Sequence, residues 1–261
     1  MYLSSAKRKR NYQKKYEYNL FNFLPQELLF LIFSHLNGTD LRSCACVCRY
    51  WNILISTLLI QDIVIICDIT RSTSIYWSEL LRDLNNIFSI NDHIRFGFVG
   101  YTDHLPSFKP HQLISSYPLT YHSSALVQYL DAITLGKGKD YPEAVLDGIY
   151  SAINLNWRFN ASKSLILICD SPPHGSQYSS QNGDYHDNFP EGCPCGLKES
   201  FLFSILSKFN ISLYILYTHI DMEYTISIFQ SYYPNIKSFL VDDFNFFPIL
   251  NSICKQPDLN T

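Results

Sequence analysis

A carboxylate and two hydroxyl groups alternate along one short segment of the chain. Asp68, Thr70 and Ser72 directly follow an apolar run, so an extended turn would point all three side chains at one spot. Carboxylate and hydroxyl oxygens are hard ligands, which favour Mg²⁺ or Ca²⁺ over zinc or copper. Asp170 follows another apolar run and can supply a second carboxylate. The segment predicts a hard-cation site or, as the alternative, a vestigial cluster that only stabilises a turn.

The region around these acids alternates between strand and helix. Apolar runs typical of strands lie at 63–67, 94–99, 165–169, 211–217 and 236–241, with a weaker edge-strand candidate at 113–119. Helical periodicity lies at 77–88, 123–135, 142–155, 197–209, 222–232 and 244–253. The alternation predicts an α/β fold, a doubly wound and mostly parallel sheet with helices on both faces.

In such a sheet, functional residues gather beyond the carboxyl ends of the strands. Asp68, Asp103 and Asp170 each follow a predicted strand, and we expect them near one site. Asp242 and Asp243 follow the last strand, so we expect them farther away.

Two roles are open for Asp140. It precedes Pro142 and Glu143, so it could cap the helix expected from residue 142, with Glu143 reaching back in a capping box. It could instead ligate the metal, and one residue cannot easily do both.

A zinc site is suggested by residue type but not by spacing. His174, His186, Cys193 and Cys195 are zinc-ligating types, yet only one residue separates the two cysteines, which fits no strong zinc template. The Ser, Gly, Asn and Asp residues around 177–188 favour a loop over the sheet edge instead.

From Phe21 to Ile60 the apolar spacing is helical. Pro25 suits a first helical turn, and Leu28, Ile32 and Leu36 then share one face. About 35 residues of helix bury too little area to be stable alone, so this module needs a partner or the next domain.

The order and spacing of Leu24-Pro25-x-Glu27, Asp40-Leu41 and Val47-Cys48-Arg49-x-Trp51 resemble an F-box. The resemblance implies docking onto the Skp-type adaptor of a cullin–RING ubiquitin ligase. The alternative is that these helices only cap the core of the next domain. The expected adaptor-binding residues are Leu24, Pro25, Leu28, Ile32, Leu36, Leu41, Val47 and Trp51.

Residues 60–254 resemble a von Willebrand factor A domain, in its metal motif and in further segments at 96–104, 138–148, 169–175 and 190–197. Those segments look like an intracellular branch that includes the A domains found with alpha-type protein kinases. The resemblance implies a metal-ion-dependent adhesion site for Mg²⁺ or Ca²⁺, completed by an acidic side chain of a protein ligand. Its residues here would be Asp68, Thr70, Ser72, Asp170 and, unless it is a cap, Asp140.

The sequence departs from that family at two positions near the metal. Arg71 stands where glycine is common, and it either weakens metal binding or pairs with Asp103. Tyr141 stands where many A domains have a threonine ligand.

Charge is unevenly distributed along the chain. Residues 1–17 hold six Lys or Arg and one Glu, a net charge of +5. The net charge of the whole chain is −3, so the other residues together carry −8. The near-neutral total gives no support for a nucleic-acid binder, while the basic arm is either a nuclear address or a solvated tail. We expect no secretory signal, no membrane span and no disulfides, hence a cytoplasmic or nuclear protein.

We therefore expect a basic arm at 1–20, an F-box at 21–58, an A-like domain at 60–254 and a tail at 255–261. The expected function is a non-catalytic, substrate-recruiting subunit that binds a Skp-type adaptor, a cullin and an unknown protein substrate. The alternative is a non-ligase scaffold with a vestigial metal site. A metal-dependent hydrolase with His174 as base is disfavoured, because the sequence has no nucleophile and base at a diagnostic spacing.

Overall fold

The computed structural model describes residues 24–34, 36, 38–58, 60–91, 94–104, 113–159, 161–178 and 186–255. The predicted basic arm and the tail beyond residue 255 lie outside these residues, as does the side chain of Leu41.

One sheet of six strands organises the larger domain, in the order β3-β2-β1-β4-β5-β6. All neighbouring pairs are parallel except β2 with β3, which is the edge strand with the weakest apolar pattern. The predicted α/β class, a mostly parallel sheet, is confirmed. The strands are β1 (Gln61–Asp68), β2 (Arg95–Tyr101), β3 (Ile114–Thr120), β4 (Ser162–Cys169), β5 (Ile211–Tyr217) and β6 (Lys237–Leu240).

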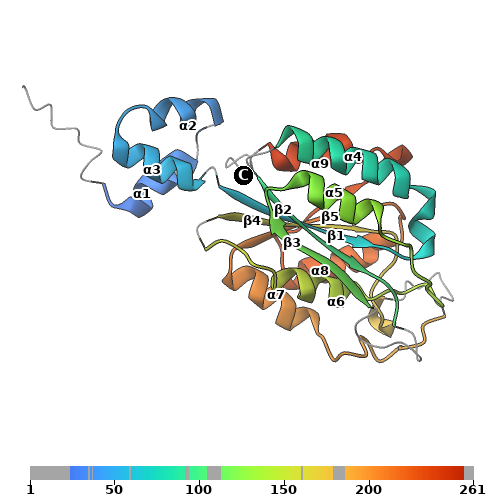
Figure 1. Ribbon diagram of the computed structural model, residues 1–261. Helices are drawn as coiled ribbons and strands as arrows, with labels where there is room; N and C mark the ends of the chain where they lie inside the picture. The colour runs from blue at the N-terminus through green and yellow to red at the C-terminus, as the bar shows by residue number, and fades with distance from the viewer. Residues whose placement is uncertain are drawn as a thin grey trace, which may run out of the picture.

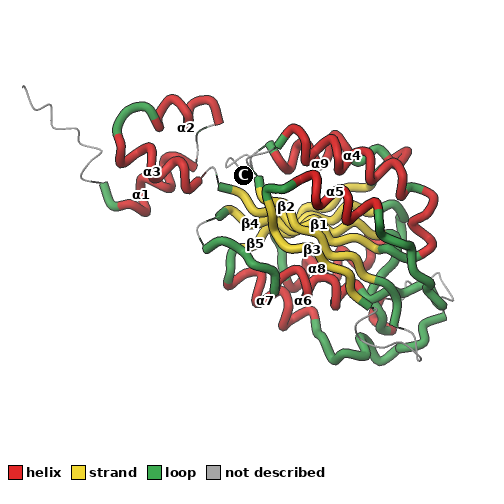
Figure 2. The backbone as a smooth tube through the Cα atoms, in the orientation of Figure 1, coloured by secondary structure: helices red, strands yellow, loops and turns green. Residues whose placement is uncertain are grey.

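Helices cover both faces of the sheet (Figure 1). One layer holds α4 (Trp77–Ile90), α5 (Ser123–Asp131) and α9 (Phe247–Cys254). The other holds α6 (Val145–Ile153), α7 (Glu199–Lys208) and α8 (Met222–Tyr232). Successive β1 side chains enter opposite cores, which is why its apolar run is continuous rather than alternating. Figure 2 shows the strands between the two helix layers, with long loops gathered at one end of the sheet.

Two predicted helices are too long because loop contacts compete for their terminal residues. α6 begins at Val145, not at 142, since the Glu143 and Ala144 N–H groups donate to the carbonyls of Pro172 and Thr102 instead. α5 ends at Asp131, not at 135, and the chain then passes beside β1, where Gly136 N–H donates to the Ile69 carbonyl. The three carbonyl groups that accept these bonds all belong to residues far along the chain from their donors.

A helical module precedes the sheet domain and has a core of its own. It consists of α1 (Gln26–Ser34), α2 (Gly38–Ala45) and α3 (Arg49–Leu58). Its buried side chains are Leu29, Phe33, Trp51, Leu54 and Ile55. The Phe33 and Trp51 rings pack edge to face with centroids 5.0 Å apart. Within the described ranges, no helix is long and apolar enough to cross a lipid bilayer.

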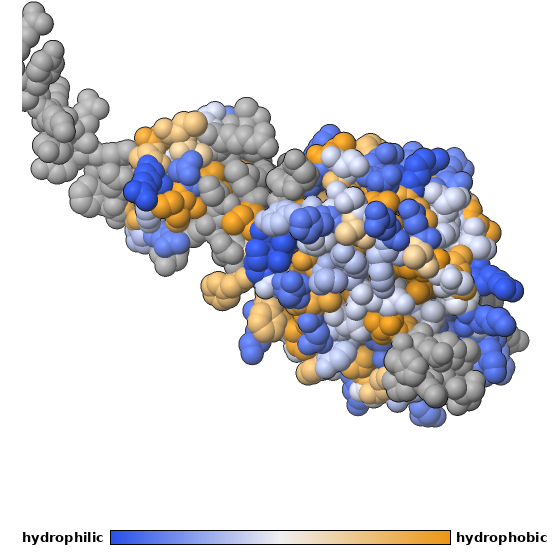
Figure 3. All heavy atoms as spheres, viewed as in Figure 1, coloured by the Kyte–Doolittle hydropathy of each residue, from blue (hydrophilic) through white to orange (hydrophobic). Residues whose placement is uncertain are grey.

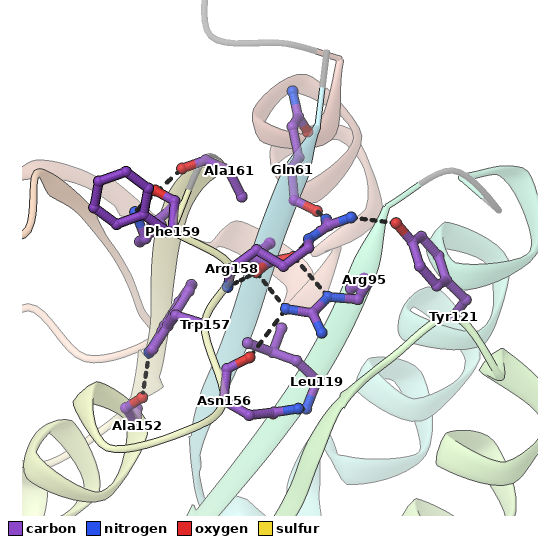
Figure 4. Close-up of polar contacts among 12 residues, drawn as sticks. Gln61, Arg95, Leu119, Tyr121, Ala152, Asn156, Trp157, Arg158, Phe159 and Ala161 are labelled. Carbon is purple, nitrogen blue, oxygen red and sulfur yellow. Dashed lines mark hydrogen bonds and ion pairs between the residues drawn. The ribbon is translucent and has the colours of Figure 1, made fainter. Parts of the chain in front are cut away.

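A buried carboxylate ties strands together at the amino end of the sheet (Figure 4). Asp62 on β1 is fully buried and accepts hydrogen bonds from the guanidinium groups of Arg95, at 2.9 and 2.6 Å, and Arg158, at 2.9 and 2.5 Å. Arg158 also donates to the Gln61 carbonyl and the Tyr121 hydroxyl. Burial opposes ionisation of Asp62, but the two arginines outweigh it and lower the pKa of this carboxyl.

We predict that Asp62→Asn destabilises the protein by about 3 kcal/mol at pH 7, because it leaves two partly buried arginines without their counter-charge. The lowered pKa gives a stabilisation that is present above the unfolded value of about 3.9 and lost as pH falls through the folded value. Urea unfolding from pH 7 to pH 3 measures both effects. The exposed Asp131→Asn change is the control, expected within about 0.5 kcal/mol of wild type; an equal loss in both variants would contradict the role of Asp62.

Candidate metal centre

The two central strands deliver two carboxyl groups to one place. Asp68 is the last residue of β1, and Asp170 directly follows β4, its parallel neighbour. β2 lies on the other side of β1, so this is the switch point of the sheet, where such folds place their sites. The Asp68 side chain is fully buried and contacts the Asp170 carboxyl group. The structure thus brings together the two acids that the sequence predicted to meet.

The turn after β1 brings in the two predicted hydroxyl groups. Thr70 N–H donates to Asp68 Oδ1 at 2.7 Å, which folds the chain back over the strand end. The Thr70 and Ser72 hydroxyl oxygens lie 3.0 Å apart. Ser72 belongs to a 3₁₀ turn, Arg71–Ile75, and is exposed, whereas Thr70 is buried. Four oxygen-bearing side chains therefore gather at the end of β1, with Ser72 on the solvent side.

Glu143 is a third acid in this cluster that the sequence analysis did not select as a site residue. Its N–H donates to the Pro172 carbonyl at 2.9 Å, while the next residue, Ala144, donates to the Thr102 carbonyl at 3.0 Å. These bonds hold the segment between the ends of β2 and β4. The Glu143 carboxyl group, 4% exposed, contacts the Thr70 hydroxyl and feels the charges of Asp68 and Asp170.

Burial and mutual repulsion disfavour ionisation of these acids. Burial, followed by the Asp170 charge, raises the pKa of Asp68 well above its usual range. Burial, followed by the charge of Asp68, raises the pKa of Glu143 to about 11. A group of carboxyls so placed is stabilised by a bound cation or by protons.

The unused oxygen atoms fit a hard cation. Asp68 Oδ2 and Glu143 Oε2 are buried and have no hydrogen-bond partner among the residues that the structure describes. A buried carboxylate oxygen without a partner is costly, and a cation would satisfy it. The donor set of carboxylates and hydroxyls is the one that Mg²⁺ and Ca²⁺ prefer.

A second acidic group lies beside the first and contains Asp140. Asp140 does not cap α6, whose N-cap residue is Ala144, so the capping alternative is wrong. Its Oδ2 accepts from Asn188 N–H at 2.6 Å, 48 positions along the chain. Asp140, His174 and Asp187 place one ligand atom each within 4.8 Å of one another, a group that could hold a metal ion.

His174 is clamped between two carboxylates. Its Nε2 lies 3.1 Å from Asp103 Oδ1 and its Nδ1 lies 2.8 Å from Asp187 Oδ1. Burial opposes protonation, but these two acids outweigh it and raise the pKa of the imidazole. Asp103 Oδ2 is also used, by the Lys139 N–H at 2.8 Å. Since both ring nitrogens are engaged, His174 has no free position for a general base.

The two residues that depart from the family pattern lie at the rim. Arg71 is exposed and is not among the partners of Asp103 in the described part of the chain, so their predicted pairing is not formed. The Tyr141 hydroxyl lies 3.4 Å from the Asp170 carbonyl oxygen and 3.3 Å from His219 Nδ1. Asp242 and Asp243 follow β6, an outer strand of the sheet, in keeping with the expected distance from the site.

A further metal-competent group contains both loop cysteines. Cys193 and Cys195 meet His104 and Asp147, with ligand atoms within 4.8 Å of one another. The candidate histidines considered from sequence are elsewhere: His174 is clamped as above and His186 is exposed. Because His104 and Asp147 are distant in sequence, spacing within the cysteine loop could not identify them.

The predicted adaptor-binding residues fall into two classes. Pro25, Leu28, Ile32 and Val47 are exposed, while Leu24 and Leu36 are partly buried against the small core. Trp51 is buried in that core. Trp51 therefore packs beneath the exposed residues of the predicted adaptor-binding set and is not itself available for contact.

Comparison with known proteins assigns both modules. Residues 21–65 match the F-box-like family. The alpha-protein kinase vwkA of Dictyostelium discoideum is 29% identical over 171 residues, which are 63% of this chain and 26% of the kinase. The chain thus spans about a quarter of that relative.

Solved structures share the fold at low identity. The pilus adhesin SpaC from Lactobacillus rhamnosus GG superposes with a TM-score of 0.51 at 13% identity, over 75% of this chain and 30% of the adhesin. Proximal thread matrix protein 1 from the mussel byssus gives 0.51 at 14% identity, over 79% and 50%. An F-box-like domain is thus followed here by a von Willebrand factor A-like α/β domain, with distant homology to the kinase.

We predict that Glu143→Gln stabilises the metal-free protein by about 2 kcal/mol at pH 7, because glutamine is neutral in both the folded and the unfolded state. For wild type in chelator, the raised pKa makes stability fall as pH rises from about 4.3 toward 11, and the variant lacks this slope. Urea unfolding in chelator between pH 5 and pH 9 tests this. Exposed Glu191→Gln is the matched control, and a destabilised Glu143→Gln protein would contradict a neutral Glu143.

Proposed function

We propose that this chain, an F-box-like domain followed by a von Willebrand factor A-like domain, is a non-catalytic, substrate-recruiting subunit of a cullin–RING ubiquitin ligase. Residues 21–58 would bind the Skp-type adaptor and, through it, the cullin. Residues 60–254 would bind the protein to be ubiquitinated. Such a role places the protein in the cytoplasm or nucleus, where that ligase works.

The observation that carries the proposal is the apolar surface of the helical module. Large hydrophobic side chains of α1 and α3 and the segment between α2 and α3 are 40–56% exposed, and hydrophobic atoms are visible on this module in Figure 3. Those residues are Leu28, Leu31, Ile32, Val47, Tyr50 and Ile53. An apolar surface on so small a module is what a complementary groove would cover.

The small core explains how that surface is held. Phe33 and Leu29 point inward from α1, so Leu28 and Ile32 on the same helix are turned outward. Trp51 closes the core from α3, against Phe33. Trp51 and Phe33 would therefore position the docking residues, and truncating either would act through the fold of the module.

We predict that Leu28→Ser with Ile32→Ser abolishes copurification with the Skp-type adaptor and cullin. Both side chains are exposed, so the change removes contact area and leaves the buried core intact. The control is Ile75→Ser with Ile90→Ser, two isoleucines of the other domain that are also exposed, which should retain both partners. Retention of the adaptor by the first variant would overturn the proposed docking surface. Wild type that copurifies with the adaptor and without cullin would favour a scaffold outside the ligase.

For the A-like domain, the proposed ligand-binding element is a metal-ion-dependent adhesion site. Asp68, Thr70, Ser72 and Asp170 would hold Mg²⁺ or Ca²⁺, and Glu143 would add a nearby buried carboxylate. Asp140, the remaining expected ligand, lies in the adjoining group with His174 and Asp187, so it would act on the rim. The exposed side at Ser72 and Arg71 leaves room for an acidic side chain of a partner protein, which the metal and the arginine would both attract.

The alternative is a non-ligase scaffold with a vestigial site, and one observation favours it. Burial and mutual repulsion raise the pKa values of Asp68 and Glu143, so in this alternative bound protons would neutralise the cluster in place of a cation. A hydrolase is not favoured, because His174 has both ring nitrogens engaged.

We predict that Mg²⁺ raises the thermal stability of wild type and not that of Asp68→Ala. Binding to the folded state alone adds about 2.7 kcal/mol when the free metal is 100-fold above its dissociation constant. Differential scanning fluorimetry with Mg²⁺, Ca²⁺ and chelator measures it, with exposed Asp131→Ala as control. A wild type that responds to neither cation would support the vestigial site.

A further inference from the structure

Four metal-ligating side chains from three distant segments meet at one edge of the carboxyl-end loops. His104 follows β2, Asp147 lies in the first turn of α6, and Cys193 and Cys195 lie in the loop before α7. His104 and Asp147 are under 10% exposed, Cys193 is half-buried and Cys195 is exposed. None of the four belongs to the proposed magnesium site.

Their distances are close to those of a tetrahedral ligand set. Cys193 Sγ lies 3.8 Å from His104 Nε2 and 3.1 Å from Asp147 Oδ2, and the imidazole and carboxylate atoms are 2.8 Å apart. The Cys195 thiol also contacts the Asp147 carboxylate. Zinc bond lengths to sulfur, nitrogen and oxygen imply ligand–ligand separations of about 3.3–3.8 Å in a tetrahedron. Small side-chain shifts would therefore admit an ion at the centre.

We infer that His104, Asp147, Cys193 and Cys195 bind a structural zinc ion. Thiolates are soft ligands and select zinc over magnesium or calcium, while one imidazole and one carboxylate complete a four-coordinate site. Without an ion, two thiols and an imidazole share one buried carboxylate, and thiols are weak hydrogen-bond donors that stabilise its charge poorly. Binding would release the two thiol protons to solvent, leaving the thiolates as ligands.

The backbone around the cysteines is shaped for such a site. Gly192 and Gly196 flank the pair with φ of +109° and +73°, a region that other residues rarely adopt. The N–H of Gly196 donates to the Cys193 carbonyl at 2.9 Å, closing a tight turn. Burial and the Asp147 carboxylate raise the pKa of the Cys193 thiol in the absence of an ion, while the N–H groups of Cys195 and Leu197 hydrogen-bond to its sulfur and oppose that shift. The loop thus presents both sulfurs toward β2 and α6.

Zinc at this point would fasten the loop that completes the rim of the first site. Phe189 packs edge to face on His174, with centroids 5.1 Å apart, and the His104 and His174 rings lie 5.6 Å apart. Asp187, from the same loop, holds His174. Zinc would therefore fix the wall of the acidic groups, while taking no part in the proposed magnesium chemistry.

The test is zinc content of the purified full-length protein by inductively coupled plasma mass spectrometry, after gel filtration in Mg²⁺ and a phosphine reductant. We expect about one zinc per chain. Cys195→Ser, at the most exposed ligand, should weaken zinc binding more than about 100-fold in a chelator competition, since even outer-shell partners are worth about 10- to 100-fold. Cobalt loaded in place of zinc should show the visible bands of a tetrahedral thiolate site, and Cys195→Ser should shift them.

The matched control is Cys46→Ser, which removes an exposed thiol that also lies in a Cys-x-Cys spacing. The Cys46→Ser protein should contain as much zinc as wild type. Asp68→Ala and Asp140→Asn should keep it too, which separates this site from the two acidic groups. Wild type without zinc, or Cys195→Ser and Asp147→Asn proteins that retain it at full affinity, would overturn the inference. Since zinc is measured without the ligase, its outcome is independent of adaptor binding.

Discussion

Burial of acidic groups at the switch point of the sheet is the constraint around which the larger domain is arranged. Asp68 ends a strand that is buried along its whole length, so its carboxyl group cannot reach bulk water. Glu143 is held beside it by its backbone bond to Pro172, and Asp170 by its position directly after β4, the parallel neighbour of β1. Only a cation, protons or directed donors can offset such a concentration of charge.

The compensation extends outward from Asp68 through contacts between loops. Asp103 is balanced by His174, which in turn engages Asp187, and Asp187 also accepts N–H groups of Gly175 and Phe189. The loop that carries Asp187 continues to Cys193 and the adjoining group. Two metal-competent regions therefore share a wall of packed aromatic and imidazole rings.

The two modules differ in how much apolar surface they bury. The sheet domain buries a core on each face, with the Asp62 cluster fastening its amino end. Its loops are then free to specialise in binding. Among the residues that the structure describes, the helical module buries five large side chains and leaves six large hydrophobic residues exposed. Stability therefore resides in the domain that would select a substrate, whereas the module that would join the ligase gains stability by docking.

Local patterns determined most of the elements. Apolar runs and helical periodicity identified every strand and α-helix that the structure describes in the sheet domain, because those periods follow from backbone geometry. The positions of Asp68, Thr70, Ser72 and Asp170 after predicted strands likewise indicated that these four residues lie near one another. Only the tertiary structure decided which residues join them. Glu143 joins the acids because its N–H donates to the Pro172 carbonyl. Asp140, for which a cap and a ligand role were both open, accepts from Asn188 N–H, and the two cysteines lie beside His104 and Asp147. Each of those partners is more than 25 positions away, and a contact between loops that distant leaves no periodic trace in sequence.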